Sequence, residues 1–220
     1  MTNMQSQLRS IIHDDLTLEV SLIHEAIPVP GPEEVLIEIQ AAPINPSDLL
    51  LLLGPVDPES IRIEKQSESP VVLGKIFEKA RGMIDDRIGQ SMMVGNEGAG
   101  LVVDAGKSDI AQALKGKMVG VFGGGMYTQY RCLNVNQCLP LLEGTTAEQG
   151  ASCFVNPMTA LGMVETMRME GHTALVHTAA ASNLGQMLNR VCLGDGIGLT
   201  NIVRSSEQVA LLEEQGSVYT

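Results

Sequence analysis

The sequence predicts an α/β plus β fold, in which a β-rich domain over residues 1–150 is followed, over residues 151–220, by the first part of a doubly wound parallel sheet. Two observations indicate the β-rich domain: apolar and polar residues alternate, and many short segments are separated by glycine and proline, as in a small barrel or sandwich. A third observation indicates the sheet. From about residue 145 onward, helical spacing leads into a strand–helix–strand–helix order.

The first domain is expected to consist of short strands separated by turns. Alternation is clearest in "LTLEVSLIHEAIPVP" and "EEVLIEIQAAPI", and "GPEE" marks a turn. A short helix follows in "NPSDLLLLLG", with Asn45 as its N-cap, Pro46 as its first residue and Gly54 as its end. Residues 55–90 are polar and irregular, which indicates a surface insertion with a helix around 74–84. The segment "GNEGAGLVVDAG" predicts a turn and a strand, and "GKMVGVFGGGMYTQYRCLNV" predicts two strands around a glycine hinge.

The second domain begins with helical spacing in "TTAEQGASCFVNPMTALGMVETM", for which Thr145 and Thr146 are alternative caps. Alternating strands and helices are expected after it. In chain order these are a strand at Ala174–His177, a helix at Asn183–Cys192, a strand at Leu199–Val203 and a helix at Ser206–Gln215.

Composition and charge exclude several classes of protein. The net charge is −12 and no basic cluster occurs, which excludes a nucleic-acid partner. No apolar run approaches the length of a membrane span, and the N-terminal segment "MTNMQSQLRSIIHDD" lacks the apolar core of a secretory signal, so we expect a cytoplasmic protein. The four cysteines form no C-x-x-C pair, and we expect reduced thiols rather than a disulfide scaffold.

The turn "HTAAASNLG" occupies the place where a dinucleotide-binding fold has its glycine-rich turn, between a strand and a helix. The three glycine positions of that turn correspond to Ala180, Ser182 and Gly185. Small residues there let a pyrophosphate approach the backbone, and the helix N-terminus presents free N–H groups. The alternative is plain helix–strand packing, which small residues also permit.

The residue that ends the second strand indicates which cofactor is bound. An acidic residue at this position usually binds the ribose hydroxyls of NADH, whereas this chain has Arg204, followed by Ser205 and Ser206. An arginine pairs well with a 2′-phosphate, to which the serines can also donate. The spacing therefore favours NADPH over NADH, although an exposed arginine in a loop is the simpler alternative.

Four segments together resemble a known family. "AAPINPSDLLLLLG", "VGNEGAGLVVDAG", "FVNPMTALGMVETM" and "TAAASNLGQ" occur in the order and spacing of the medium-chain dehydrogenase/reductase superfamily, and more narrowly resemble its zinc-free quinone oxidoreductases and enoyl thioester reductases. The resemblance covers nearly the whole chain and is weakest over residues 55–90. It implies a GroES-like β-barrel domain followed by a Rossmann domain. It also implies that NADPH is contacted by residues of the second domain, namely Asn156, Thr159, Ser182, Asn183, Leu184, Gly185, Arg204, Ser205 and Ser206.

The same resemblance suggests a zinc-free substrate pocket. Zinc-dependent relatives have a cysteine at the position of Asn45 and a histidine at that of Asn96, and a carboxamide binds Zn²⁺ poorly. We therefore expect no metal. Asp48 and Glu97 are further pocket candidates, with helix capping and a structural ion pair as the respective alternatives. The tyrosine that is thought to donate a proton in enoyl thioester reductases corresponds to Val56, so no catalytic residue is identified.

Two functional hypotheses follow, because a Rossmann domain of this family has about six parallel strands and this sequence predicts two. The resemblance thus implies a C-terminally truncated relative. The first hypothesis is an NADPH-dependent, zinc-free reductase that transfers a hydride to a quinone or activated enone, a small-molecule substrate, with a homodimer possible in the full-length form. The second is a non-catalytic fragment with weak or no nucleotide binding, which acts, if at all, through protein contacts.

Overall fold

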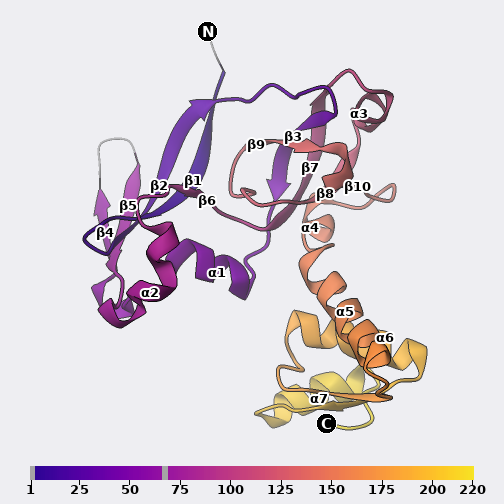
Figure 1. Ribbon diagram of the computed structural model, residues 1–220. Helices are drawn as coiled ribbons and strands as arrows, with labels where there is room; N and C mark the ends of the chain where they lie inside the picture. Colours follow the sequence, from indigo (N-terminus) through magenta and orange to yellow (C-terminus); the bar gives the residue numbers. More distant parts are fainter. Residues whose placement is uncertain (1–2, 66–68) are drawn as a thin grey trace. The chain divides into compact units, whose positions relative to one another are not determined.

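The computed structural model describes residues 3–65 and 69–220, which form two compact units, Met1–Ser152 and Cys153–Thr220 (Figure 1). The first unit contains two curled antiparallel sheets of the kind expected for a GroES-like domain, and the second contains a parallel pair of strands with helices. The predicted fold class is confirmed. Within the described ranges, no helix is long and apolar enough to span a membrane.

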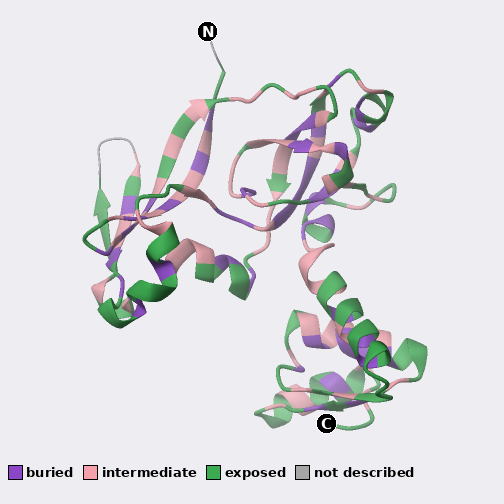
Figure 2. Ribbon diagram, viewed as in Figure 1, coloured by how far each residue is buried: buried purple, intermediate pink, exposed green. Residues whose placement is uncertain are grey.

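The two sheets of the first unit have five strands each, and all their strand pairs are antiparallel. The first sheet contains, in spatial order, β4 (Arg62–Lys65), β5 (Pro70–Lys75), β2 (Thr17–Ala26), β1 (Met4–Ile12) and β6 (Met92–Met93). The second contains β10 (Cys138–Pro140), β8 (Met118–Phe122), β7 (Glu97–Ala105), β3 (Glu34–Ala41) and β9 (Tyr130–Asn134). Figure 2 shows buried residues along β7 and β8, which belong to the core of this second sheet.

Short helices connect these strands. The α-helices of the first unit are α1 (Pro46–Leu53), α2 (Arg81–Ile84), α3 (Asp109–Leu114) and α4 (Ala147–Gly150). The 3-10 helices are η1 (Pro58–Ser60), η2 (Glu78–Ala80), η3 (Asp85–Arg87) and η4 (Val135–Gln137). The prediction for α1 is confirmed: Asn45 precedes it, Pro46 opens it and Gly54 ends it with φ of 59°, the left-handed region that glycine tolerates.

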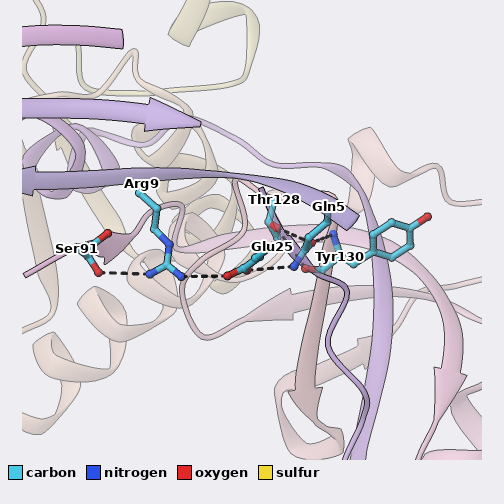
Figure 3. A network of polar contacts seen from close by, with 6 residues as sticks. All are labelled: Gln5, Arg9, Glu25, Ser91, Thr128 and Tyr130. Carbon is cyan, nitrogen blue, oxygen red and sulfur yellow. Dashed lines mark hydrogen bonds and ion pairs between the residues drawn. The ribbon is translucent and has the colours of Figure 1, made fainter. Parts of the chain in front are cut away.

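Strand β1 is absent from the sequence-based expectations, although it pairs with β2 along its full length from Met4–Ala26 to Ile12–Leu18. Its inward side chains include Gln5 and Gln7, which are 3% and 2% exposed. Figure 3 shows how the Gln5 amide is satisfied. Its Oε1 accepts from the Tyr130 backbone N at 2.8 Å and from Thr128 Oγ1 at 2.9 Å, and its Nε2 donates to Glu25 at 3.2 Å.

The expected helix over residues 74–84 is wrong at its start, because Pro70–Lys75 forms β5 and helical structure begins only at Glu78. β5 pairs with both β2 and β4, so part of the predicted surface insertion belongs to a sheet. A glycine in this strand is explained by close packing. A Cβ atom at Gly74 would lie 2.5 Å from a methyl group of Val56.

The second unit begins with helix α5, after which strands and helices alternate in the predicted order. The elements are α5 (Val155–Met169), β11 (Ala174–His177), α6 (Asn183–Asp195), β12 (Gly198–Asn201) and α7 (Ser206–Glu214). β11 and β12 pair in parallel from Ala174–Gly198 to His177–Asn201. Their core contains Ala160, Val164, Leu188, Cys192 and Leu199. The helical spacing over residues 145–167 corresponds to two helices, α4, which Thr146 caps, and α5.

Candidate functional site

A cleft of about 500 Å³ lies in the second unit at the carboxyl ends of β11 and β12. Open α/β sheets bind their ligands at this edge of the sheet. Two segments line the cleft, the turn between β11 and α6 and the segment after β12. Its lining residues are Thr178, Ala179, Ala180, Ala181, Ser182, Ile202, Val203, Arg204 and Gln208. The structure therefore brings together three of the predicted site residues, Ala180, Ser182 and Arg204.

The turn is built so that α6 lies very close to the backbone of the preceding residues. Ser182 is the N-cap, and its Oγ accepts a hydrogen bond from the Gly185 backbone N at 3.1 Å. A Cβ atom at Gly185 would lie 2.3 Å from the Ala180 carbonyl oxygen and 2.6 Å from that of Ala179. Gly185 therefore retains the close-packing role of the third glycine in a dinucleotide-binding turn.

The side chains of the first two residues of α6 do not line the cleft. The Leu184 side chain packs against the core of the second unit, and neither Asn183 nor Leu184 lines the cleft. What they offer a ligand is the helix N-terminus, because the first backbone N–H groups of a helix lack partners within it. Such N–H groups, together with the helix dipole, favour an anion such as a phosphate.

Arg204 supplies the positive charge of the cleft. Within the described part of the chain its guanidinium forms no ion pair, and its side chain is exposed. Its backbone N donates to Gln208 Oε1 at 2.9 Å. Ser205 caps α7 by accepting from the Gln208 backbone N at 3.4 Å, and Ser206 is the first residue of that helix. Neither serine lines the cleft.

Asn156 and Thr159 lie on α5 and do not line this cleft. Thr159 donates a hydrogen bond to the Val155 carbonyl oxygen and lines a second, larger cavity of about 630 Å³ between α5 and β11. That cavity is mostly apolar, and it contains neither the turn nor Arg204. The smaller cleft therefore has the chemistry expected of a nucleotide site, and the larger one does not.

The four candidate pocket residues of the first unit form a single hydrogen-bonded cluster. Asn45 Nδ2 donates to Glu97 Oε1 at 2.9 Å, and the Asn45 backbone N donates to Asp48 Oδ2 at 2.8 Å. The Asn96 backbone N donates to the other oxygen of Asp48, also at 2.8 Å. Asp48 and Glu97 are fully buried. Buried carboxylates need such partners, so the cluster fixes the start of α1 against the segment before β7.

Tyr127, in the segment between β8 and β9, lies beside this cluster. Its hydroxyl donates to the Pro43 carbonyl oxygen at 3.0 Å. Burial, and secondly the nearby Asp48 carboxylate, raise the pKa of Tyr127 to about 12. The phenol is therefore protonated and a hydrogen-bond donor throughout the neutral pH range. Gly95 is the feature of the sequence that relates to this contact, because a side chain at this position would collide with the Tyr127 ring.

The described part of the chain contains neither a metal-binding cluster nor a disulfide. In residues 3–65 and 69–220, no group of three or more histidine, cysteine or acidic side chains is arranged to hold a metal ion. All four cysteines are free thiols. Burial raises the pKa of Cys132 and of Cys138 to about 11 in each case, so neither is an activated nucleophile.

Comparison with known proteins places the fold. No protein-family model matches the sequence. The mitochondrial enoyl-[acyl-carrier-protein] reductase of Caenorhabditis elegans is 24% identical over 187 residues, which are 84% of this chain and 45% of that protein. A Mesorhizobium loti protein assigned as an NADPH:quinone reductase superposes with a TM-score of 0.71 at 27% identity, over 100% of this chain and 60% of that one.

Two further solved structures agree with this result. A mycobacterial protein in complex with NADPH has a TM-score of 0.68 at 18% identity, and the CurK enoyl reductase has 0.70 at 16%. This chain spans 57% and 58% of their lengths. The comparisons therefore confirm the resemblance that the four sequence motifs indicate, to the quinone oxidoreductases and enoyl thioester reductases of the medium-chain dehydrogenase/reductase superfamily.

Proposed function

We propose that this chain carries the cofactor-binding part of a zinc-independent oxidoreductase, which transfers a hydride from NADPH to a quinone or an activated enone. One observation carries the proposal: Arg204, three residues after the second parallel strand, lines the same cleft as the turn that precedes α6. The names of the similar proteins support the same reaction class, since they are NADPH:quinone reductases and enoyl reductases.

The residues of the cleft fit the phosphate groups of such a cofactor. Ala180 and Ser182 are small and lie at the N-terminus of a 13-residue helix, which suits a pyrophosphate. Within the described residues the Arg204 guanidinium forms no ion pair with an acidic side chain, and a 2′-phosphate would supply a negatively charged partner. When bound, the nicotinamide supplies the hydride, and the protein's part is to hold and orient it.

Direct titration tests the proposal. The chain has no tryptophan, so the fluorescence of the reduced nicotinamide can be followed without interference from that residue. We expect NADPH to bind more tightly than NADH, and the bound NADPH to be oxidised by members of a quinone and enone panel. Absence of binding at millimolar NADPH would contradict the proposal and favour the non-catalytic alternative. Binding without turnover would retain the cofactor site and reject the reductase activity for this chain.

The zinc-independent part of the proposal rests on the chemistry of Asn45. Its amide nitrogen donates to Glu97, and a neutral carboxamide replaces the thiolate that zinc-dependent relatives have at this position. Metal analysis of the purified protein tests this. We expect activity to survive exhaustive chelation, and one tightly held zinc ion per chain would refute the zinc-independent assignment.

A further inference from the structure

Gln208 lines the cleft but belongs to none of the sequence motifs that led to it. We propose that Gln208 is a specificity-determining residue, which favours NADPH over NADH by holding the Arg204 segment in place and by donating a hydrogen bond to the 2′-phosphate. This inference rests on the proposed function and names the contact that distinguishes the two cofactors at its site.

The position of Gln208 on α7 explains the first role. It is the third residue of the helix, and its backbone N donates to the Ser205 cap at 3.4 Å. Its side chain turns back toward the helix start, where Oε1 accepts from the Arg204 backbone N at 2.9 Å. Both contacts restrain the segment that carries Arg204, so the guanidinium projects from a fixed backbone.

The second role follows from the atoms that these contacts leave available. Because Oε1 is committed to Arg204, the remaining polar group of the side chain is Nε2, which carries two donor hydrogens and no acceptor. Within the described residues Nε2 has no hydrogen-bond partner in the protein. A doubly charged phosphate accepts such hydrogens, and Arg204 supplies charge beside it.

The same atoms disfavour NADH. A ribose whose 2′-hydroxyl is free is usually bound by a carboxylate that accepts its hydrogens. No aspartate or glutamate is among the residues that line the cleft. The oxygen of Gln208 could accept in its place only by giving up the Arg204 backbone N–H. The cleft therefore offers donors to a phosphate and no free side-chain carboxylate to a hydroxyl.

The decisive variant is Gln208→Glu, which keeps the length of the side chain and an oxygen for the Arg204 backbone N but adds a negative charge. We expect the Kd for NADPH to rise about tenfold or more, because like charges at contact distance repel strongly in a partly solvated cleft. The Kd for NADH should change little. Ala210→Glu is the matched control, since it adds the same charge to an exposed position of α7 outside the cleft.

A second variant, Gln208→Met, adds no charge but removes both hydrogen bonds of the side chain, the one with the Arg204 backbone N and the proposed one with the 2′-phosphate. It should raise the Kd for NADPH severalfold. Adenosine 2′,5′-bisphosphate and AMP serve as probes that differ in the 2′-phosphate and require no turnover. Circular dichroism of each variant should match the wild type. If the wild type binds the bisphosphate no better than AMP, the proposed NADPH function fails and this inference fails with it. If the wild type prefers the bisphosphate and Gln208→Glu keeps that preference, this inference alone is overturned.

Discussion

Replacing Gly185 by alanine is a direct test of how the turn and α6 are built. The added Cβ atom would lie 2.3 Å from the Ala180 carbonyl oxygen and 2.6 Å from the Ala179 carbonyl oxygen. Ordinary contacts begin near 3.4 Å, so the helix would have to move away from the turn by about 1 Å. Both obstacles are backbone atoms, which cannot rotate aside as a flexible side chain can.

The expected cost exceeds the intrinsic benefit of alanine in a helix. Overpacking of a close contact destabilises proteins by roughly 1–3 kcal/mol, whereas glycine-to-alanine substitution in a helix contributes up to about 1 kcal/mol of stability. We therefore expect Gly185→Ala to lower the free energy of unfolding of the second unit. The same displacement should weaken NADPH binding, because the helix N-terminus moves relative to Ala180.

Urea unfolding followed by far-UV circular dichroism measures the effect, since the second unit contributes α5, α6 and α7. Gly194→Ala is the matched control: it lies on the same helix, is exposed, and a Cβ there would meet nothing within 4 Å. We expect Gly194→Ala to be neutral or stabilising. A Gly185→Ala protein as stable as Gly194→Ala, with unchanged cofactor affinity, would refute the close-packing explanation of this turn.

Three further predictions address the cofactor charge, the buried network and the thiols. Arg204→Asp should weaken NADPH relative to NADH, because it removes the 2′-phosphate partner and adds a like charge; an unchanged ratio of the two Kd values would contradict this. Gln5→Leu should lower the free energy of unfolding by about 1–3 kcal/mol, because it removes the buried acceptor of the Tyr130 backbone N. Gln40→Leu, a change at an exposed position of β3, is its control in urea unfolding. Because the pKa values of Cys132 and Cys138 are about 11, both thiols should be alkylated at pH 8 roughly a hundredfold more slowly than an unperturbed thiol, and the rate should rise as the pH approaches 11. Peptide mass analysis measures the modification, and fast alkylation of the native protein at pH 8 would contradict the raised pKa values.

The elements of the second unit were predictable because local and periodic signals agree there. Ser182 and Ser205 are both N-caps in the structure, and the apolar spacing between them has the period of a helix followed by a strand. The boundaries differ by a few residues, since α6 continues to Asp195 and β12 ends at Asn201. Capping residues and periodicity are properties of short segments, so the sequence displays them directly.

Strand β1 could not be found in this way because polar residues occupy several of its buried positions. Gln5 and Gln7 are buried on one face, and on the other Ser10 is buried between the apolar Leu8 and Ile12, so neither face alternates cleanly between apolar and polar residues. Gln5 is tolerated there because Thr128 and the Tyr130 backbone hydrogen-bond to it from more than 120 residues away (Figure 3). Such partners are known only once the chain has folded, and a sequence pattern contains no trace of them.

The candidate site shows the same division between local and distant information. The positions of Ala180, Ser182 and Arg204 follow from counting residues along a strand–helix–strand unit, and the structure gathers them at one cleft. Gln208 was missed because a glutamine at the third position of a helix is ordinarily read as part of a cap. Its presence in the cleft depends on the direction in which its side chain turns, toward the Arg204 backbone.

The predicted site residues of the first unit and those of the cleft also differ in how many of their polar atoms already have hydrogen-bond or ion-pair partners in the protein. In the first unit, both oxygens of Asp48 accept from backbone N–H groups, and Asn45 donates to Glu97. A ligand that used these atoms would first have to break buried hydrogen bonds, which costs free energy. In the cleft, the Arg204 guanidinium is exposed and forms no ion pair within the described residues, so a ligand that binds it breaks no such contact. We therefore expect changes at Arg204 to alter cofactor affinity at constant stability, and changes at Asp48 to act through stability.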